Sequence, residues 1–178
     1  PATVDSGFNF ATDAFLFENS RENTINLTPD LAARMFGAKE VCVDAKTPCV
    51  ATDVAAGWLD SVNRTLAEGS SEGFAVLSLL FFHGDLDPKD FAIPGDDTKI
   101  KHVSDLRIDG NAKLQGELAY WAATQSIPTA LDEDKRFEAK DVMPFLAKAL
   151  AKGSDDIYRL AIAKRTESGF SFGHAVTP

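Results

Sequence analysis

The chain has 178 residues, 44% of them hydrophobic, and is long enough to bury the core of one compact domain. Its 18 Lys and Arg residues against 27 Asp and Glu residues give a net charge of −9. This balance argues against nucleic acid or an anionic membrane as a partner, because phosphate groups require a basic surface. The longest apolar stretch, Phe74–Phe82, is too short to span a bilayer.

The first elements are expected to be extended segments followed by a short helix. Residues 7–19 (GFNFATDAFLFEN) alternate apolar and polar side chains, which is typical of a short hairpin or of two extended pieces. A helix is then expected to start at Thr28-Pro29-Asp30 and to end at Gly37. No signal peptide is visible before these elements, and a cleaved precursor or a trimmed chain is expected to look like this.

Two cysteines, Cys42 and Cys49, flank a short loop that contains Pro48. A disulfide between them would stabilise the fold by roughly 2–3 kcal/mol. Two reduced thiols in a cytosolic protein are the alternative. A metal site is disfavoured, because two thiolates without nearby histidines supply only half of a zinc site. We therefore expect the disulfide, and with it a secreted, extracellular protein.

Two helices are expected in the middle of the chain. Residues 73–82 (GFAVLSLLFF) are apolar on every face, which predicts a helix at the centre of the domain with other elements on both sides. The helix before it, over residues 53–67, carries one buried stripe of apolar residues at every fourth position (Val54, Trp58, Val62 and Leu66).

The C-terminal half predicts two more helices and then two strands. The helices cover residues 111–125 and 140–151, and the strands cover residues 157–164 and 170–177. Helices first and strands last predict an α+β fold with segregated layers. We expect a mainly helical subdomain over residues 1–152 and the start of a β subdomain over residues 153–178. Because two strands rarely suffice, the antiparallel sheet is expected to be incomplete in this chain.

Three residues are candidates for chemistry. Ser70 and Ser71 directly precede the central helix, whose N-terminus favours negative charge and would stabilise an anionic nucleophile or an oxyanion. The alternative is that one of them only caps the helix. His174 lies in the last strand, either as a general base for such a nucleophile or as a core histidine with one nitrogen satisfied.

Two segments carry a resemblance to a known family. GSSEGFAVLS (69–78), followed much later by GHAVTP (173–178), resembles papain-like cysteine peptidases. The likeness is to a bacterial secreted branch with the patterns Gly-x-Cys-Glu-Gly-Met/Phe-Ala and Gly-His-Ala-Val. The upstream LTPDLAARMFG, the cysteine pair and Trp58 also fit that branch. The resemblance implies a papain-like fold, in which a long buried central helix carries the nucleophile and the following sheet carries the histidine.

The resemblance also implies residue roles. Ser71 takes the nucleophile position and His174 the role of the base, in acyl-enzyme hydrolysis of a peptide or protein substrate. A side-chain amide shortly upstream helps to form the oxyanion hole. Asn63 is the nearest such amide; a solvent-facing helix position is its alternative reading. Gln125 is a second amide, for which solvation at a helix end is favoured. We expect no cofactor.

The sequence departs from the family pattern in two places. Ser71 stands where the pattern has cysteine, and a serine hydroxyl has no thiolate population, so the chain as written is expected to be inactive, by a natural or an engineered change. The third catalytic residue, an Asn or Asp on the next strand, would follow Pro178. We expect it on a second polypeptide that continues the sheet after proteolytic processing, or on a continuation of the chain.

Other readings remain open. The chain could be a pseudo-peptidase that binds a protein partner without cleaving it, or a serine hydrolase using Ser71, which is disfavoured because no GxSxG elbow is present. Asp85, Asp87 and Asp90 could bind calcium through oxygen. The loop lacks the glycine spacing and later acidic ligand of an EF-hand, so we expect a solvated acidic loop and no metal.

Overall fold

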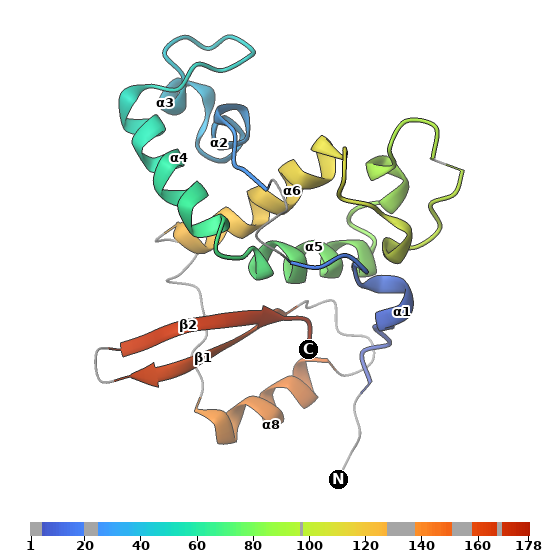
Figure 1. The fold of residues 1–178 in the computed structure, drawn as a ribbon. Helices are drawn as coiled ribbons and strands as arrows, with labels where there is room; N and C mark the ends of the chain where they lie inside the picture. The colour runs from blue at the N-terminus through green and yellow to red at the C-terminus, as the bar shows by residue number, and fades with distance from the viewer. Residues whose placement is uncertain (1–4, 20–24, 97, 128–137, 151–157, 167–168) are drawn as a thin grey trace.

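The computed structural model describes residues 5–19, 25–96, 98–127, 138–150, 158–166 and 169–178 (Figure 1). Over these residues the fold is mostly helical, with a small two-stranded antiparallel sheet at the C-terminal end. The helices are α1 (Phe10–Asp13), α2 (Pro29–Phe36), α3 (Ala38–Val41), α4 (Asp53–Leu66), α5 (Ser71–His83), α6 (Ala112–Ala123) and α8 (Ala139–Ala149). Short 3₁₀ turns are η1 (Pro88–Phe91), η2 (Val103–Asp105) and η3 (Thr124–Ser126). The strands are β1 (Leu160–Thr166) and β2 (Gly169–Val176).

The observed helix starts depend on capping side chains. The Thr28 hydroxyl accepts a hydrogen bond from the Leu31 backbone at 3.3 Å and so starts α2, which ends at Gly37 with φ of +93°. Thr52 caps α4 in the same way. Asn111 accepts from the third residue of α6 and starts that helix. Each cap satisfies a backbone N–H that the first helical turn leaves over.

The N-terminal segment was expected as a hairpin or as two extended pieces, and the hairpin is wrong. The segment contains the one-turn helix α1 between two stretches without regular secondary structure. The Asn9 side chain accepts from the Ala11 backbone, and the Asp13 carboxylate accepts from the Asn9 backbone at 2.8 Å. These reciprocal bonds close α1. The alternating apolar side chains on either side pack against α5: Phe15 contacts Phe74 edge to face at a centroid distance of 5.6 Å. The alternation of apolar and polar residues in this segment therefore arises from packing on a helix and not from pairing with a strand.

Helix α5 lies at the centre of the molecule, as its all-round apolar sequence predicts. Figure 1 shows α4 and α6 on one side of α5 and the β-hairpin with α8 on the other. Helix α6 and strand β2 both pack directly against α5. Its Leu77 side chain is fully buried, as are Leu114 and Leu118 of α6. The helix is apolar all round because it meets neighbours on several faces.

The closest approach between α5 and α6 occurs at Gly73. A Cβ atom at this position would lie 2.2 Å from the Leu118 carbonyl oxygen and 3.1 Å from the Ala122 Cβ atom. Only a residue without a side chain allows the two backbones to come this near. Gly73 therefore sets the position of the first turn of α5.

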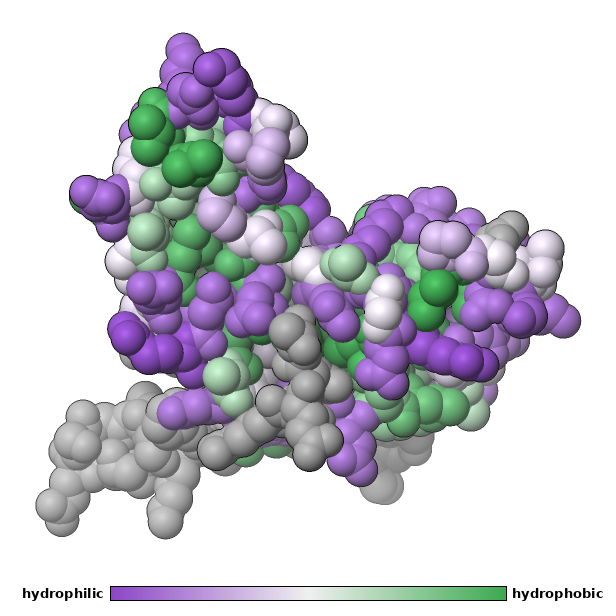
Figure 2. Space-filling model, turned by 45° about the horizontal axis from the view of Figure 1, so that its top comes forward, coloured by the Kyte–Doolittle hydropathy of each residue, from purple (hydrophilic) through white to green (hydrophobic). Residues whose placement is uncertain are grey.

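The disulfide between Cys42 and Cys49 is confirmed, with a Cα–Cα distance of 5.4 Å. The loop it closes is tied to α2, because the Cys49 backbone donates to the Asp30 carboxylate at 3.0 Å. Reduced thiols and a half zinc site, the two alternatives, are therefore wrong for these cysteines. Figure 2 shows mostly hydrophilic residues at the tip of this lobe and apolar residues below them.

The two strands form an antiparallel hairpin whose register places Ile162 opposite His174 and Ala161 opposite Ala175. The register shifts between Ala163 and Lys164, where β2 carries one extra residue. Both strands lie within about three residues of the predicted ranges. Residues 151–157, which contain the predicted subdomain boundary and the start of the first predicted strand, lie outside the described residues.

Within the described ranges, no helix combines the length and the apolar character that crossing a bilayer requires.

Candidate active site

Helix α5 begins at Ser71, and the residue before it is buried and held by two hydrogen bonds. Ser70 is 1% exposed, and its backbone N–H donates to the Asn19 side-chain oxygen at 3.0 Å. The Ser70 hydroxyl turns back and donates to the Leu66 carbonyl at 3.3 Å, so it does not serve as the helix cap. The preceding Gly69 has φ of +149°, a backbone conformation that favours glycine.

Ser71 is the first residue of the helix, and its side chain meets the C-terminal strand. The Ala175 backbone N–H donates to the Ser71 Oγ atom at 3.3 Å across 104 positions of sequence. The first helical hydrogen bond runs from Phe74 to Ser70, so the Ser71 N–H lies in the part of the turn that attracts negative charge. Ser71 is half-buried.

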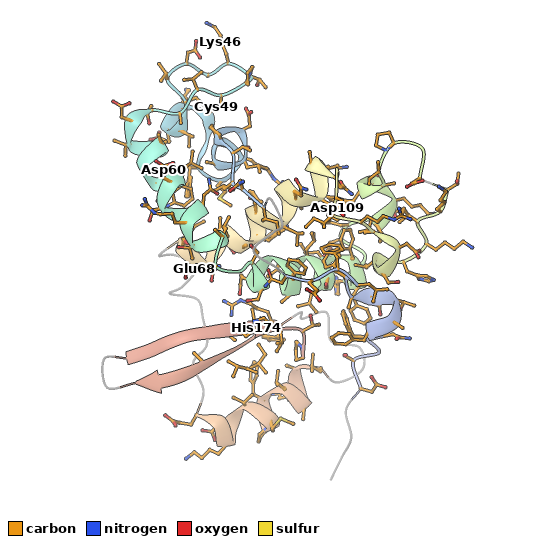
Figure 3. All side chains as sticks on the ribbon, viewed as in Figure 1. Lys46, Cys49, Asp60, Glu68, Asp109 and His174 are labelled. Atoms are coloured by element: carbon orange, nitrogen blue, oxygen red, sulfur yellow. A yellow bond between two sulfur atoms is a disulfide. The ribbon has the colours of Figure 1, made fainter. Side chains whose placement is uncertain are left out.

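His174 directly precedes the residue that contacts Ser71. Figure 3 shows it on the hairpin beneath α5, and its side chain is exposed. The structure therefore brings the two sequence-predicted residues to neighbouring positions: Ser71 contacts the backbone of Ala175, next to His174. The reading of His174 as a buried core histidine is wrong, because the residue is exposed.

The residue before His174 is Gly173, where the neighbouring strand leaves no room for a side chain. A Cβ atom on Gly173 would lie 2.3 Å from the Ile162 carbonyl oxygen and 3.1 Å from the Ala163 Cβ atom. The two strands approach this closely next to the shift in register, where β2 accommodates its extra residue. Gly173 thus allows the backbone path that places His174.

Glu72 is a buried charged residue that the sequence analysis does not single out. It is 7% exposed and forms an ion pair between its Oε1 atom and the Nε atom of Arg159, immediately before β1. A carboxylate in the first turn is favoured by the helix dipole. The available signal in the sequence is a single acidic residue in an otherwise apolar helix.

The Asn63 amide has a different role from the predicted ones. Its Oδ1 atom accepts from the Leu27 backbone N–H at 2.7 Å, and its Nδ2 atom donates to the Leu27 carbonyl at 3.0 Å. These bonds join α4 to the segment before α2, and Asn63 is half-buried instead of solvent-facing. Gln125 donates to the Ala122 carbonyl at 2.9 Å and so closes the end of α6.

Asn19 is the amide that lies next to the start of α5. Its oxygen accepts from Ser70, and its Nδ2 atom lies 3.7 Å from the point where a Cβ atom on Gly69 would stand. The sequence analysis does not select Asn19, because Asn19 precedes Ser71 by many more positions than Asn63 does. The signal that remains is an Asn at the end of the alternating N-terminal segment.

The acidic loop after α5 uses its carboxylates locally. Asp87 accepts from the Lys89 backbone at 2.9 Å and starts η1, and Asp85 lies 3.4 Å from the His83 ring nitrogen. Among the described residues, no group of three His, Cys, Asp or Glu side chains is arranged to hold a metal ion.

Comparison with protein-family models, with curated proteins and with solved structures finds no match to this chain.

Proposed function

We propose that this chain has the site of a papain-like hydrolase that cleaves peptide or amide bonds through an acyl-enzyme. Residue 71 is the nucleophile position and His174 is the general base. The observation that carries the proposal is the hydrogen bond from the Ala175 backbone to the Ser71 Oγ atom at 3.3 Å, which holds the histidine-bearing strand against the start of the central helix. The meeting of two segments that are far apart in sequence supports the proposal.

The position at the start of α5 suits an anion. A helix N-terminus carries a partial positive charge, and nearby N–H groups can stabilise a thiolate or a tetrahedral oxyanion. A serine hydroxyl remains protonated in this environment, so the chain with Ser71 is inactive or nearly so. With cysteine at this position, the helix and a protonated His174 together would favour the thiolate.

The reaction at such a site has balanced steps. The Sγ atom of a cysteine at position 71 forms a bond with the substrate carbonyl carbon. His174 gives its proton to the leaving nitrogen as the C–N bond breaks. A water molecule then attacks the thioester and His174 accepts a proton from it. The C–S bond breaks, the carboxylic acid leaves, and the cysteine returns to a thiolate beside the protonated His174. The exposure of His174 supports access by a substrate and by water.

Asn19 is our candidate for the side-chain donor of the oxyanion hole, in place of Asn63. Its carboxamide oxygen is occupied by the Ser70 backbone, which leaves its NH₂ group directed away from that bond. The backbone N–H of Ser71 would be the second donor. Asn63, by contrast, gives its Nδ2 atom to the Leu27 carbonyl.

The partner and location are also proposals. A two-stranded sheet is marginal by itself, and Ile162 of β1 is 57% exposed, which supports an additional strand from a second polypeptide that would supply the orienting Asn or Asp. The disulfide supports a secreted protein, because disulfides persist in oxidising compartments.

Replacing Ser71 with cysteine tests the proposal directly. We expect Ser71→Cys to react with an epoxide-based papain-type inhibitor and to cleave a mixed library of quenched fluorescent peptides. Ser70→Cys is the matched control, because Ser70 is adjacent but buried and directed toward Leu66. It is expected to stay unlabelled. Adding His174→Ala to Ser71→Cys is expected to abolish cleavage.

Absence of both labelling and cleavage in folded Ser71→Cys would contradict the hydrolase proposal. It would favour the second candidate, a pseudo-peptidase that binds a protein partner without cutting it. The observation in favour of that candidate is the serine itself, whose Oγ atom serves as a hydrogen-bond acceptor for the strand backbone. Labelling of unmodified Ser71 by a fluorophosphonate would instead indicate a serine hydrolase.

A further inference from the structure

We propose that Arg159 is a positioning residue, which anchors the β-hairpin to the first turn of α5 through its ion pair with Glu72. The meaning of this anchor for catalysis rests on the proposed function, because what it holds in place is His174 beside residue 71. The anchor itself is a property of the fold and can be tested without any activity.

The first two residues of α5 hold different strands of the hairpin. The Ser71 Oγ atom accepts from Ala175 of β2, and the Glu72 Oε1 atom pairs with the Nε atom of Arg159, one residue before β1 begins at Leu160. One contact is on β2 and the other is on the residue before β1, and both lie at the open end of the hairpin, where Ala161 pairs with Ala175. Consecutive residues of the helix therefore determine where the histidine-bearing strand lies.

The ion pair is the stronger of these two contacts. The side chain of Glu72 is 9% exposed and that of Arg159 is 22% exposed, so water screens their attraction little. The bond from Ala175 to Ser71 is a single neutral hydrogen bond at 3.3 Å, near the long end of the usual range. Water replaces a charged contact of low exposure less well than it replaces that hydrogen bond. Loss of the ion pair should therefore free the hairpin more than loss of the bond from Ala175 to Ser71.

The pair also has an electrostatic consequence for residue 71. A carboxylate on the next residue opposes the formation of an anion at position 71, because like charges at short range repel. The Arg159 guanidinium offsets this negative charge. Loss of Arg159 should therefore disfavour a thiolate at position 71, whereas loss of the Glu72 charge removes a repulsion and by itself favours the thiolate.

Two separate measurements test the anchor. The first uses the chain with Ser71 unchanged and follows amide hydrogen exchange of Ala175 by NMR. In Glu72→Gln and in Arg159→Gln we expect exchange at Ala175 to rise by about tenfold or more, while the amides of Leu77 in α5 stay protected. Arg159→Lys retains the charge and is expected to recover most of the protection.

The second measurement uses Ser71→Cys and follows the rate of thiol alkylation by iodoacetamide as a function of pH. We expect Arg159→Gln to reduce the rate at pH 6 by about tenfold. Glu72→Gln should reduce it less, because it releases the hairpin in the same way but also removes the carboxylate that opposes the thiolate. Arg34→Gln is the matched control: Arg34 pairs with Glu117, whose side chain is 11% exposed, in a bridge between α2 and α6. It is expected to change neither readout.

Unchanged Ala175 exchange in folded Glu72→Gln and Arg159→Gln would overturn the proposal, and so would an equal change in Arg34→Gln. If one glutamine variant fails to fold, the other together with Arg159→Lys decides the question in the same way. The cysteine in Ser71→Cys, with the ion pair intact, could be alkylated with the pH dependence of an unperturbed thiol. That result would count against the proposed function only. The exchange measurement then still decides whether Arg159 anchors the hairpin.

Discussion

Replacing Gly73 with alanine sets two effects against each other. Alanine has the higher helix propensity and would stabilise an isolated α5 by roughly 1 kcal/mol. In the folded protein its Cβ atom would lie 2.2 Å from the Leu118 carbonyl oxygen, whereas ordinary contacts begin at 3.4 Å. The contact has to lengthen by more than 1 Å, and the obstacle is backbone on α6, which cannot rotate away as a side chain would.

The steric effect should dominate this substitution. Overpacking a well-packed core typically costs 1–3 kcal/mol, and here α5 and α6, which both carry fully buried leucines, must separate. We expect Gly73→Ala to lower the free energy of unfolding by about 2 kcal/mol or more, measured by urea denaturation followed by circular dichroism. The first turn of α5 should shift, so the Gly73→Ala/Ser71→Cys protein should also lose reactivity at the cysteine.

Gly57 provides the matched control for this prediction. It lies inside α4, and a Cβ atom on it would meet nothing within 4 Å. Gly57→Ala should therefore stabilise the protein by about 0.5–1 kcal/mol, because only the propensity effect operates. A Gly73→Ala protein that is as stable as the unmodified protein would refute the reasoning about close packing of α5 and α6.

Four other changes have defined outcomes. Reducing the Cys42–Cys49 disulfide should lower the free energy of unfolding by roughly 2–3 kcal/mol, and an unchanged urea midpoint would contradict this. Gly173→Ala added to Ser71→Cys should lower the rate of peptide cleavage, because it moves His174, while circular dichroism shows an unchanged helical content. Equal cleavage rates with and without Gly173→Ala would count against a role of Gly173 in placing His174. Asn63→Ala should cost about 1–3 kcal/mol in urea denaturation without affecting labelling of that cysteine, and a loss of labelling alone would restore its oxyanion role. Two backbone hydrogen bonds lower the pKa of Asp105 from 3.8, so the stability it contributes is present above that value and lost as pH falls through the folded pKa; Asp105→Asn should remove this acid dependence of local amide exchange, measured by NMR.

Local signals in the sequence account for the helix ranges, although Val54, predicted in the buried stripe of α4, is 85% exposed. Thr28 and Thr52 act on backbone groups within three residues, and Gly37 ends α2 through its own φ angle. Such effects operate over one turn, so they can be read without knowledge of the fold. The same local reading failed for residues 7–19, because alternating apolar residues pack equally well on a strand or across a buried helix.

The predicted site was only partly accessible from sequence. Ser71 and His174 were predicted from a likeness of the segments around them to a known family, and their roles stay predictions. Asn63 was selected because it is close in sequence, yet its amide binds Leu27, while Asn19 lies beside Ser70 from much farther away. Distance along the chain is a poor guide to which amide stands at the start of α5.

The sequence by itself determined the order of the elements, the central position of α5 and the candidate pair of residues. The tertiary structure alone decided which residues meet at the start of that helix: Asn19 against Ser70, Ala175 against Ser71, and Arg159 against Glu72. Caps and periodicity arise from interactions within a few residues, so they leave a pattern in the sequence. Contacts between distant segments depend on how whole elements pack, and a single sequence carries no local pattern for them.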